Sequence, residues 1–489
     1  MHNHSDIPAT IGSDKRVRLL NGEKVRYVNL DNTATTPAFV EVKQTVDDFL
    51  EWYASVHRGS GYKSFLSTWL YEQARKRVGE FFGYEPGHHI VIFTNNTTGA
   101  INKVVRILQL TKDDIVLTSR IEHSSNELPW RQFATRQRYE SEADGTIVID
   151  SIERRLRKYG KKVKLIAVTG ASNVTGYIPP YHDIAEIAHR YGVPVLVDCA
   201  QLASHRRIEM LSPKDPKHLD FIAFSAHKMQ APFGVGALIG PREIFEPDTV
   251  PSDEPGGDTT DLCTEDKVYW APPPARFESG TPNAVGVIAL AKSLEVLNRY
   301  GMDRLAEHGK KLWLWAVRGI NKLKGVTLYV DPDDISDRTP NIPFNIEGYN
   351  HGLTAAILGF EYGIGVRHGR LCADELVRLL LGFPKKDEKY LVEQVINYGR
   401  KTKVYGLVRA SIGICNTDED IERLVEAVGR IVRDGSKFEY EPEYDEQATA
   451  KHGKIETGDF RPKGFTLQDI LSNADLSENL LSLQNLDSL

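Results

Sequence analysis

The chain has 489 residues, of which 41% are hydrophobic, and it carries a formal net charge of −6. This length exceeds that of one average domain, so two domains with extensions are expected. The acidic balance argues against nucleic acid as a partner, because proteins that bind phosphate backbones normally present a basic face. No apolar run approaches the 20 or so residues of a membrane span, which argues against a membrane protein.

The four cysteines are Cys199, Cys263, Cys372 and Cys415. They are widely separated and form no CxxC pair, so the sequence predicts neither a disulfide framework nor a zinc site. The first residues, 1–6, are polar and lack the apolar core of a signal peptide. We therefore expect a soluble protein of a reducing compartment, the cytoplasm.

Between residues 89 and 240, short apolar runs typical of buried strands alternate with amphipathic helices. The strand-like runs are 89–93, 115–117, 164–169, 194–197, 221–224 and 234–239, and two helices show apolar stripes at Ile101, Val104, Val105 and Leu108 and at Ile184, Ile187, Ala188 and Tyr191. The alternation predicts an α/β fold with a mainly parallel sheet covered on both faces. Ligands of such sheets bind outside the carboxyl ends of the strands. Asn95, Asn173, Asp198 and Ser225 lie at or just after those ends.

The second half of the chain begins with helical patterns at 285–300 and 305–323, followed by a smaller α+β region at 325–432. The acidic run 439–446 contains a proline and predicts a linker. Beyond it, Thr466 and Asp469 have the spacing of a helix capping box and precede scattered leucines. The tail is interpreted either as short amphipathic helices that dock on a partner or as a frayed end. We expect an extension at 1–30, a cofactor-binding large domain at 31–300, a small C-terminal domain at 301–435, and a linker with a leucine-containing tail at 436–489.

Lys228 and Asp198 carry the strongest chemical signal. A lysine amine forms a Schiff base with an aldehyde cofactor, and Lys228 lies in the run Phe224 to Lys228, which follows a strand. A carboxylate at a strand end, such as Asp198, keeps the ring nitrogen of pyridoxal phosphate protonated and so makes the ring an electron sink. The pair therefore indicates amino-acid chemistry, although each residue alone is also compatible with an ordinary turn.

A phosphate site is predicted at 93–100, where a strand is followed by the start of a helix. The segment holds three threonines, two asparagines and a glycine, which suit an anion bound at a helix N-terminus. The alternative is an ordinary helix cap, which needs only one of those side chains.

Three further residues have two interpretations each. His123 follows a strand and either stacks on a cofactor ring and transfers protons or is a structural histidine. Cys372 lies in a loop with cationic neighbours, which lower the pKa of a thiol and favour a nucleophile, but cysteine is also a common core residue. Arg409 either binds an amino-acid carboxylate or forms a surface ion pair.

No metal site is expected. His182 and His189 lie seven residues apart on a predicted helix, about 10 Å along its axis, which is too far for one ion. The sequence also lacks the HExxH, Walker A and GxSxG motifs.

Taken in order, these segments resemble the aminotransferase class V group of fold-type I pyridoxal-phosphate enzymes, in particular SUF-type cysteine desulfurases and selenocysteine lyases. The resemblance runs from Leu30-Asp31-Asn32-Thr33-Ala34 to Ile412-Gly413-Ile414-Cys415-Asn416. Between these ends it includes 56–59, 95–98, Glu122-His123, Ser172-Asn173, Asp198-x-x-Gln201, Ser225-x-His227-Lys228 and 277–283.

The resemblance implies a role for each matching residue. Pyridoxal 5'-phosphate would be bound covalently by Lys228, with His123 stacked on its ring, Asp198 at the ring nitrogen and Gln201 at the phenolic oxygen. Its phosphate would be held by Asn96, Thr97, Ser225 and His227, and by Thr281 of the other subunit, which implies a homodimer with shared sites. Asn173 would contact the cofactor and orient a small amino-acid substrate, Arg409 and Arg367 would lie on the substrate side, and Cys372, five residues after Arg367, would accept sulfur.

The loop around Cys372 departs from the family pattern. Ser124 stands where a second histidine is usual, His368 replaces a small hydroxyl residue, and Arg370-Leu371 replaces a pair of histidines. The leading hypothesis is a desulfurase that forms a persulfide on Cys372 and alanine from L-cysteine, and passes the sulfur on, for example to an acceptor protein. The second is a class V aminotransferase, racemase or other C–S lyase acting on a different amino acid, in which Cys372 is not catalytic. The third is a non-catalytic scaffold whose tail recruits a partner.

Overall fold

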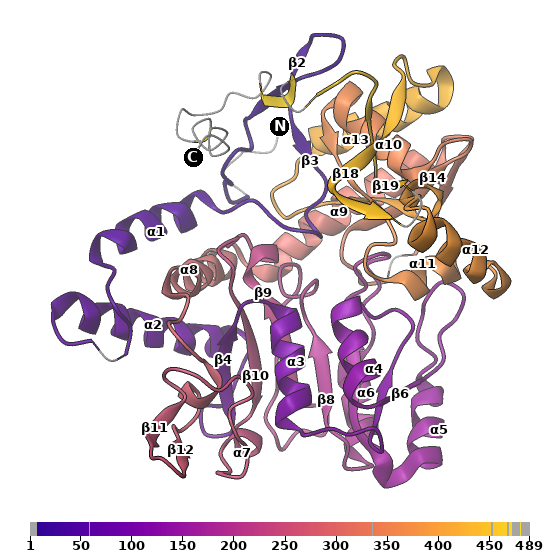
Figure 1. Ribbon diagram of the computed structural model, residues 1–489. Coiled ribbons are helices and arrows are strands. Elements are labelled where there is room, and N and C mark those ends of the chain that lie inside the picture. The colour runs from indigo at the N-terminus through magenta and orange to yellow at the C-terminus, as the bar shows by residue number, and fades with distance from the viewer. Residues whose placement is uncertain are drawn as a thin grey trace.

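The computed structural model describes residues 7–57, 59–334, 336–450, 453–466, 469–471 and 480, without the side chains of 446–450. Its main feature is a seven-stranded sheet in the order β4-β10-β9-β8-β7-β5-β6 (Figure 1). The strands are β4 (His89–Thr94), β5 (Ile115–Thr118), β6 (Thr135–Arg138), β7 (Val163–Thr169), β8 (Val195–Asp198), β9 (Phe221–Ser225) and β10 (Gly236–Pro241). Strand β10 runs antiparallel to both neighbours, whereas β9, β8, β7, β5 and β6 are parallel. The predicted mainly parallel sheet is confirmed.

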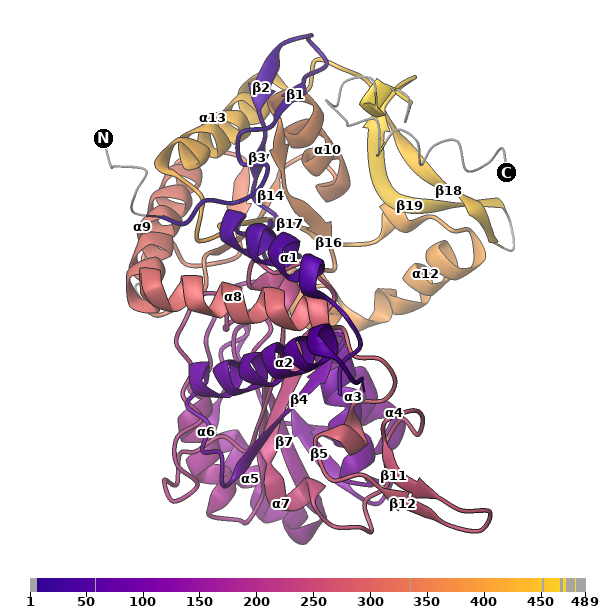
Figure 2. The ribbon, with the colours of Figure 1, turned by 90° about the vertical axis from the view of Figure 1, so that its left-hand side faces the viewer.

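Helices cover both faces of this sheet because its strands are apolar on both sides. In β4, Ile90 and Ile92 pack with α3 and α4, whereas Val91 and Phe93 face the opposite core, as expected for side chains that alternate along a strand. The covering helices are α1 (Val40–Trp52), α2 (Tyr62–Phe81), α3 (Thr97–Ile107), α4 (Leu128–Phe133), α5 (Ile149–Tyr159), α6 (Tyr181–His189), α7 (Arg242–Phe245) and α8 (Ala284–Tyr300). Figure 2 shows α8 and α2 crossing one face of the sheet.

A smaller antiparallel sheet, in the order β13-β14-β17-β16, has its own apolar core. Its strands are β13 (Val326–Leu328), β14 (Asn341–Ile346), β16 (Arg367–Gly369) and β17 (Leu407–Ser411), and the helices of this region are α9 (Met302–Asn321), α10 (His351–Tyr362), α11 (Asp374–Leu380), α12 (Glu388–Val392) and α13 (Asp418–Asp434). The short strand β3 (Val28–Asn29) pairs in parallel with β15 (Ile364–Gly365). Val28 and Leu30 are buried in this core, so the start of the chain packs with the small sheet.

The remaining elements are short. Two hairpins are formed by β1 (Arg16–Arg18) with β2 (Lys24–Arg26) and by β11 (Thr260–Cys263) with β12 (Val268–Trp270). The 3-10 helices are η2 (Ser124–Asn126), η3 (Gly160–Lys162), η4 (Ala226–Lys228), η5 (Ala275–Phe277), η6 (Lys385–Asp387) and η8 (Lys401–Lys403), and η7 (Glu393–Asn397) is a π-helix. No helix in the described part of the chain has both the length and the apolar character of a membrane span.

The acidic run predicted to be a linker forms a strand instead, and that prediction is wrong. Strands β18 (Tyr440–Ala450) and β19 (Gly453–Pro462) make an antiparallel hairpin beside α10 and β16 (Figure 2). The acidic strand is stabilised by basic residues opposite it, since Arg461 pairs with Glu441 at 3.3 Å. The predicted capping box is confirmed, because Thr466 and Asp469 exchange hydrogen bonds. Most of the leucine-containing tail (467–468, 472–479 and 481–489) lies outside the described residues.

Candidate active site

A cavity of about 370 Å³ lies at the carboxyl ends of the parallel strands, where residues of the small sheet meet the large one. Twelve residues predicted for the site line it: Asn96, Thr97, His123, Asn173, Asp198, Gln201, Ser225, His227, Lys228, Arg367, Cys372 and Arg409. Thr281 does not, and lines a separate pocket with Asn95 and Glu278. The fold therefore brings together residues separated by more than 300 positions, as expected for ligand sites of open α/β sheets.

Lys228 and Asp198 lie at neighbouring strand ends, where Asp198 is buried and Lys228 is partly buried. Asp198 is the last residue of β8, which pairs with β9, and Lys228 follows β9 in η4. Burial lowers the pKa of Lys228 to about 8, against the attraction of Asp198. Burial raises the pKa of Asp198, whereas the N–H of Ala200, 3.0 Å from Oδ1, and the charge of Lys228 lower it. A lysine with so low a pKa offers a neutral amine near physiological pH, as a nucleophile or base requires.

His123 follows strand β5 and is the N-cap residue of η2. Its Nδ1 accepts a hydrogen bond from the N–H of Ser125 at 3.1 Å, which places the proton of the neutral ring on Nε2. Burial, and then the charges of Lys228 and Arg409, lower the pKa of His123 to about 4. The ring is therefore neutral at pH 7 and suited to stack on a flat ligand.

The N-terminus of α3 has more polar groups than capping requires. Asn96 caps the helix, since its Oδ1 accepts from the N–H of Gly99 at 3.0 Å. Ser225 Oγ lies 2.8 Å from the N–H and 2.7 Å from Oγ1 of Thr97, so hydroxyls from two strand ends meet here. Gly236 permits this approach, because a Cβ there would lie 2.7 Å from the Cα of Asn96. The cap and the predicted anion site therefore coexist at this helix end.

Arg409, on β17, is a buried cation on the side of the cavity opposite the helix end. It is 3% exposed, and it donates to Asp31 at 3.1 Å and to the carbonyl of Asn173 at 2.8 Å, while its Nε has no partner. Asp31 also pairs with Arg367 at 2.9 Å. Burial lowers the pKa of Arg409 to about 10, so it remains charged at neutral pH. Arg409 does form an ion pair, but not at the surface as the alternative interpretation required.

The loop of Cys372 is exposed and is anchored by two neighbours. Leu371 and Cys372 both have left-handed φ angles, 56° and 52°, which are costly for residues with side chains. Ser124 donates to the Cys372 carbonyl from its N–H at 2.7 Å and from its Oγ at 3.0 Å. Asn173 donates to the Leu371 carbonyl at 2.6 Å. Cys372 is thus not a core residue, and its thiol belongs to the cavity lining.

The residues present fit pyridoxal phosphate, the cofactor expected from the resemblance. The donor set comprises a partly buried amine, a buried carboxylate, a neutral imidazole and hydroxyls at a helix N-terminus. Two buried polar atoms at the cavity lack a protein partner, Asn173 Oδ1 and Arg409 Nε. Buried polar groups are normally hydrogen-bonded, so these atoms indicate that the cavity receives a polar ligand.

Three residues that support the site were not predicted from the sequence. Asp31 holds both arginines, and Ser124 holds the Cys372 carbonyl. Glu122 is buried and bonded to Ser119 at 2.5 Å and to Asn126 at 2.7 Å, and burial raises its pKa to about 7. Asp31 lies two residues after β3, whereas Glu122 and Ser124 lie four and six residues after β5, so a position close to a strand end could have indicated only Asp31.

Comparisons with known proteins agree with this geometry. A family profile described as aminotransferase class-V matches residues 28–424. A probable cysteine desulfurase of Halalkalibacterium halodurans is 33% identical over 418 residues, 84% of this chain and 93% of that protein, and one of Staphylococcus aureus is 32% identical with 84% and 92% covered.

Solved structures show the same similarity. The apo cysteine desulfurase of Thermococcus onnurineus NA1 has a TM-score of 0.73 at 29% identity, covering 83% of this chain and 95% of its own. A cysteine desulfurase of Escherichia coli with an S-sulfonic acid has a TM-score of 0.69 at 27% identity, covering 83% and 94%. The hairpin β18–β19 lies beyond the residues that the family profile matches.

Proposed function

This chain belongs to the aminotransferase class-V family, and from that premise we propose that it is a cysteine desulfurase. It removes sulfur from L-cysteine, stores it as a persulfide on Cys372 and forms alanine. The observation that carries this proposal is that the exposed Cys372, on an anchored loop, lines the same cavity as Lys228, whose pKa is lowered to about 8.

The family depends on pyridoxal phosphate, which when bound supplies an electron sink next to the substrate's α-carbon. Lys228 would hold the cofactor and would move the α-proton of the substrate with its Nζ. Other residues that line the cavity would fix the cofactor's position: Asp198 at the ring nitrogen, His123 on the ring face, Gln201 at the phenolic oxygen, Asn173 beside them, and Asn96, Thr97, Ser225 and His227 at the phosphate.

Arg409 binds the carboxylate of the substrate, with Arg367 beside it. Its Nε is free of protein partners, and Asp31 fixes the orientation of both guanidinium groups. Asn173 orients the bound substrate through the Oδ1 that has no protein partner. A buried arginine binds a carboxylate strongly because the interaction is charge-assisted and little screened by water.

The sulfur step uses the thiolate of Cys372. Its Sγ attacks the sulfur of L-cysteine, an S–S bond forms, and the C–S bond breaks. The electron pair of the broken bond stays on carbon, which takes up a proton, so that alanine leaves and the sulfur remains on Cys372 as a persulfide. A thiol of an acceptor, such as a partner protein, then receives that sulfur.

The active enzyme is a homodimer with shared sites. Thr281 lies outside the cavity of its own chain and is available to the phosphate site of a partner subunit. Helices α1 and α2 project from the molecule (Figure 1) and carry large exposed apolar side chains: Trp52 at 48%, Tyr62 at 86%, Phe65 at 75% and Trp69 at 52% exposure. Such a surface is typical of a subunit interface.

We place the enzyme in the cytoplasm. All four cysteines are free, including the exposed Cys263 and Cys372, which suits a reducing compartment.

The direct test is to measure alanine released from L-cysteine in the presence of a thiol reductant. Wild type should release alanine, Cys372→Ala should lose nearly all of this activity, and Lys228→Ala should lose it completely. Cys263→Ala is the matched control, since this exposed cysteine lies on β11, outside the cavity, and its loss should leave the rate unchanged.

Other results separate the competing hypotheses. Alanine released equally by Cys372→Ala would show that this thiol is not the sulfur acceptor. A protein that binds the cofactor, shown by its visible absorption, but releases no alanine acts on a different amino acid. A protein that binds no cofactor would support the scaffold hypothesis.

A further inference from the structure

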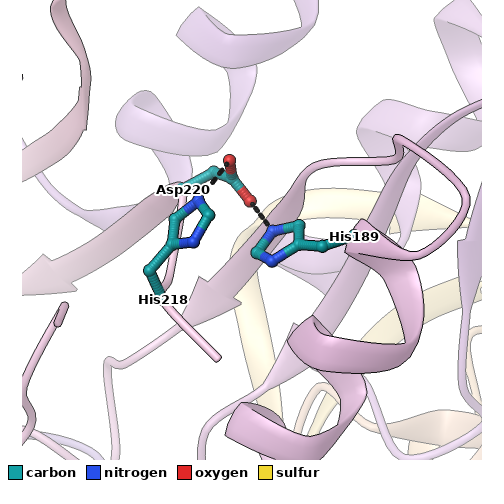
Figure 3. Close-up of side chains that lie close together, drawn as sticks. All are labelled: His189, His218 and Asp220. Atoms are coloured by element: carbon teal, nitrogen blue, oxygen red, sulfur yellow. Dashed lines mark hydrogen bonds and ion pairs between the residues drawn. The ribbon is translucent and has the colours of Figure 1, made fainter. Parts of the chain in front are cut away.

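Three side chains of metal-ligating type converge at the amino ends of the central strands of the large sheet, whereas the active-site cavity lies at the carboxyl ends. His189 is the last residue of α6, His218 lies in the loop before β9, and Asp220 directly precedes that strand (Figure 3). Their potential ligand atoms lie within 4.8 Å of one another. The three side chains are 17%, 18% and 15% exposed, so the cluster is mostly enclosed yet still reachable from solvent.

The hydrogen bonds of both histidines turn the same nitrogen toward the carboxylate. His189 Nδ1 lies 2.8 Å from the carbonyl of Pro216, and His218 Nδ1 lies 2.7 Å from the carbonyl of Asp215. A carbonyl only accepts, so both Nδ1 atoms carry the proton. In the neutral rings the Nε2 lone pairs then point at Asp220, at 2.9 Å for His189 and 3.5 Å for His218. The two Nε2 atoms and the carboxylate therefore face one another, as ligands of one ion do.

The two imidazole rings are stacked, with their centroids 4.1 Å apart and their planes at 18°, so that their nitrogens lie side by side. Asp220 Oδ2 already accepts the N–H of Val195 at 2.8 Å. A single divalent cation satisfies both nitrogens and the carboxylate together.

We propose that His189, His218 and Asp220 form a binding site for a divalent transition-metal ion of the zinc type. Two imidazole nitrogens and one carboxylate oxygen are a ligand set that zinc accepts, whereas magnesium and calcium prefer oxygen alone. The two Nε2 atoms approach different oxygens of Asp220, Oδ2 at 2.9 Å from His189 and Oδ1 at 3.5 Å from His218, and all the ligand atoms lie within 4.8 Å of one another. Water completes the coordination from the exposed side.

The outer contacts also match those of a metal site. Metal-bound histidines almost always donate the other ring N–H to a carbonyl, a carboxylate or water, as both histidines do here. The spacing of His182 and His189 in the sequence did not indicate this site, because the other two ligands lie in a different segment, before β9. His182 takes no part, since its Nδ1 bonds the carbonyl of Lys217 at 2.8 Å.

The place of the proposed ion in the fold determines its role. The site joins the end of α6 and the loop before β9 to the start of that strand, while Lys228 and Asp198 lie at the strands' other ends. The ion therefore cross-links two segments of the large domain, the end of α6 and the segment that leads into β9, and stabilises them without contacting the reacting groups.

The test is zinc binding to the purified, cofactor-loaded enzyme by equilibrium dialysis against Zn²⁺ with metal analysis. We expect one tightly bound ion per chain. Asp220→Asn and His218→Asn should weaken binding at least about 100-fold, beyond the roughly 10- to 100-fold that loss of an outer-shell partner costs. His182→Asn is the matched control on the same helix and should bind zinc as wild type does. Zinc should also raise the thermal midpoint of wild type and His182→Asn but not of the other two variants.

Cobalt substitution identifies the ligands independently. Co²⁺ should give the intense visible bands of a four-coordinate ion without the thiolate charge-transfer band that a cysteine ligand adds. Absence of stoichiometric zinc binding to wild type, unchanged binding to Asp220→Asn, or a cobalt spectrum with thiolate bands would overturn the proposal.

Discussion

Ser124 shows how one residue adapts the catalytic loop of this chain. The family that this chain resembles usually has a histidine at this position, whereas here the Ser124 hydroxyl and N–H both hold the carbonyl of Cys372. The loop needs this support because Leu371 and Cys372 adopt left-handed backbone conformations. The serine therefore positions the proposed sulfur acceptor, although it contacts no reacting atom.

Removing that hydroxyl should slow sulfur transfer without abolishing it. Ser124→Ala loses one hydrogen bond to the Cys372 carbonyl and keeps the bond from the N–H, so we expect about a 2- to 10-fold lower rate of alanine release, the equivalent of about 0.5–1.5 kcal/mol. The KM for L-cysteine should change little. Ser141→Ala is the control, because the Ser141 hydroxyl has no partner to lose. An unchanged rate in Ser124→Ala would show that the hydroxyl does not position the loop.

The lowered pKa of Lys228 predicts how the apoenzyme takes up its cofactor. Burial shifts this pKa from 10.5 down to about 8, so the neutral amine predominates above pH 8 and the charged form below it. The rate at which added pyridoxal phosphate becomes bound should rise about tenfold per pH unit up to pH 8 and then level off. Stopped-flow absorbance measures this rate directly. A rise that continues to pH 10 would mean that Lys228 titrates like an exposed lysine.

At the scale of elements, the hairpin β18–β19 is attached to the small domain by specific polar contacts. Glu456 is 8% exposed, and its Oε2 accepts from the N–H of Thr402 at 2.9 Å and from its Oγ1 at 2.5 Å. His368, in the strand before Cys372, bonds Asp459 at 2.7 Å. The hairpin thus lies against the segment that leads into the catalytic loop.

Glu456 should contribute most of this attachment. Glu456→Ala leaves a buried N–H of Thr402 without an acceptor, which should cost about 1–3 kcal/mol, whereas Glu456→Gln retains an acceptor and should cost less. Hydrogen exchange at Thr402 and along β19 should accelerate in Glu456→Ala only. Asp459→Asn removes a half-exposed ion-pair partner and should change stability by less than about 1 kcal/mol. Equal effects of Glu456→Ala and Glu456→Gln would contradict this role.

The elements differ in how far the sequence predicts them. Strands β7, β8 and β9 were predictable because a strand buried on both faces is a short, continuously apolar run, and their carboxyl ends located Asn173, Asp198 and Ser225. The hairpin was not, because its acidic strand is neutralised only by basic residues some 20 positions later, Arg461 opposite Glu441 and Lys463 beside Glu439. The roles of Asp31 and Ser124 were not predictable either, because their partners Arg409 and Cys372 lie 378 and 248 positions further along the chain. For the described chain we propose the division expected from the sequence, a large domain at 31–300 and a small one at 301–435.

At the scale of the whole molecule, Thr281 is separated from the other residues proposed to bind the phosphate. The polar groups around the N-terminus of α3 line one cavity, while Thr281 lines a different pocket. If the exposed aromatic surface of α1 and α2 pairs two chains, each subunit gives Thr281 to its partner and receives one in return. In a mixed dimer of one Lys228 variant and one Thr281 variant, both defects then fall in the same site and leave the other site intact.

A hybrid dimer tests this exchange. Co-expression of Lys228→Ala and Thr281→Val with different affinity tags, followed by two purification steps, isolates the dimer with one chain of each. The Thr281→Val chain keeps Lys228 and receives an intact Thr281 from its partner, so one site of two is complete and the hybrid should have about half the wild-type activity. If Thr281 acted within its own chain, the hybrid would instead show only half the activity of the Thr281→Val homodimer. The two expectations differ as long as the Thr281→Val homodimer is less active than wild type. If that homodimer retains less than half of the wild-type activity, a shared site makes the hybrid more active than both parent homodimers.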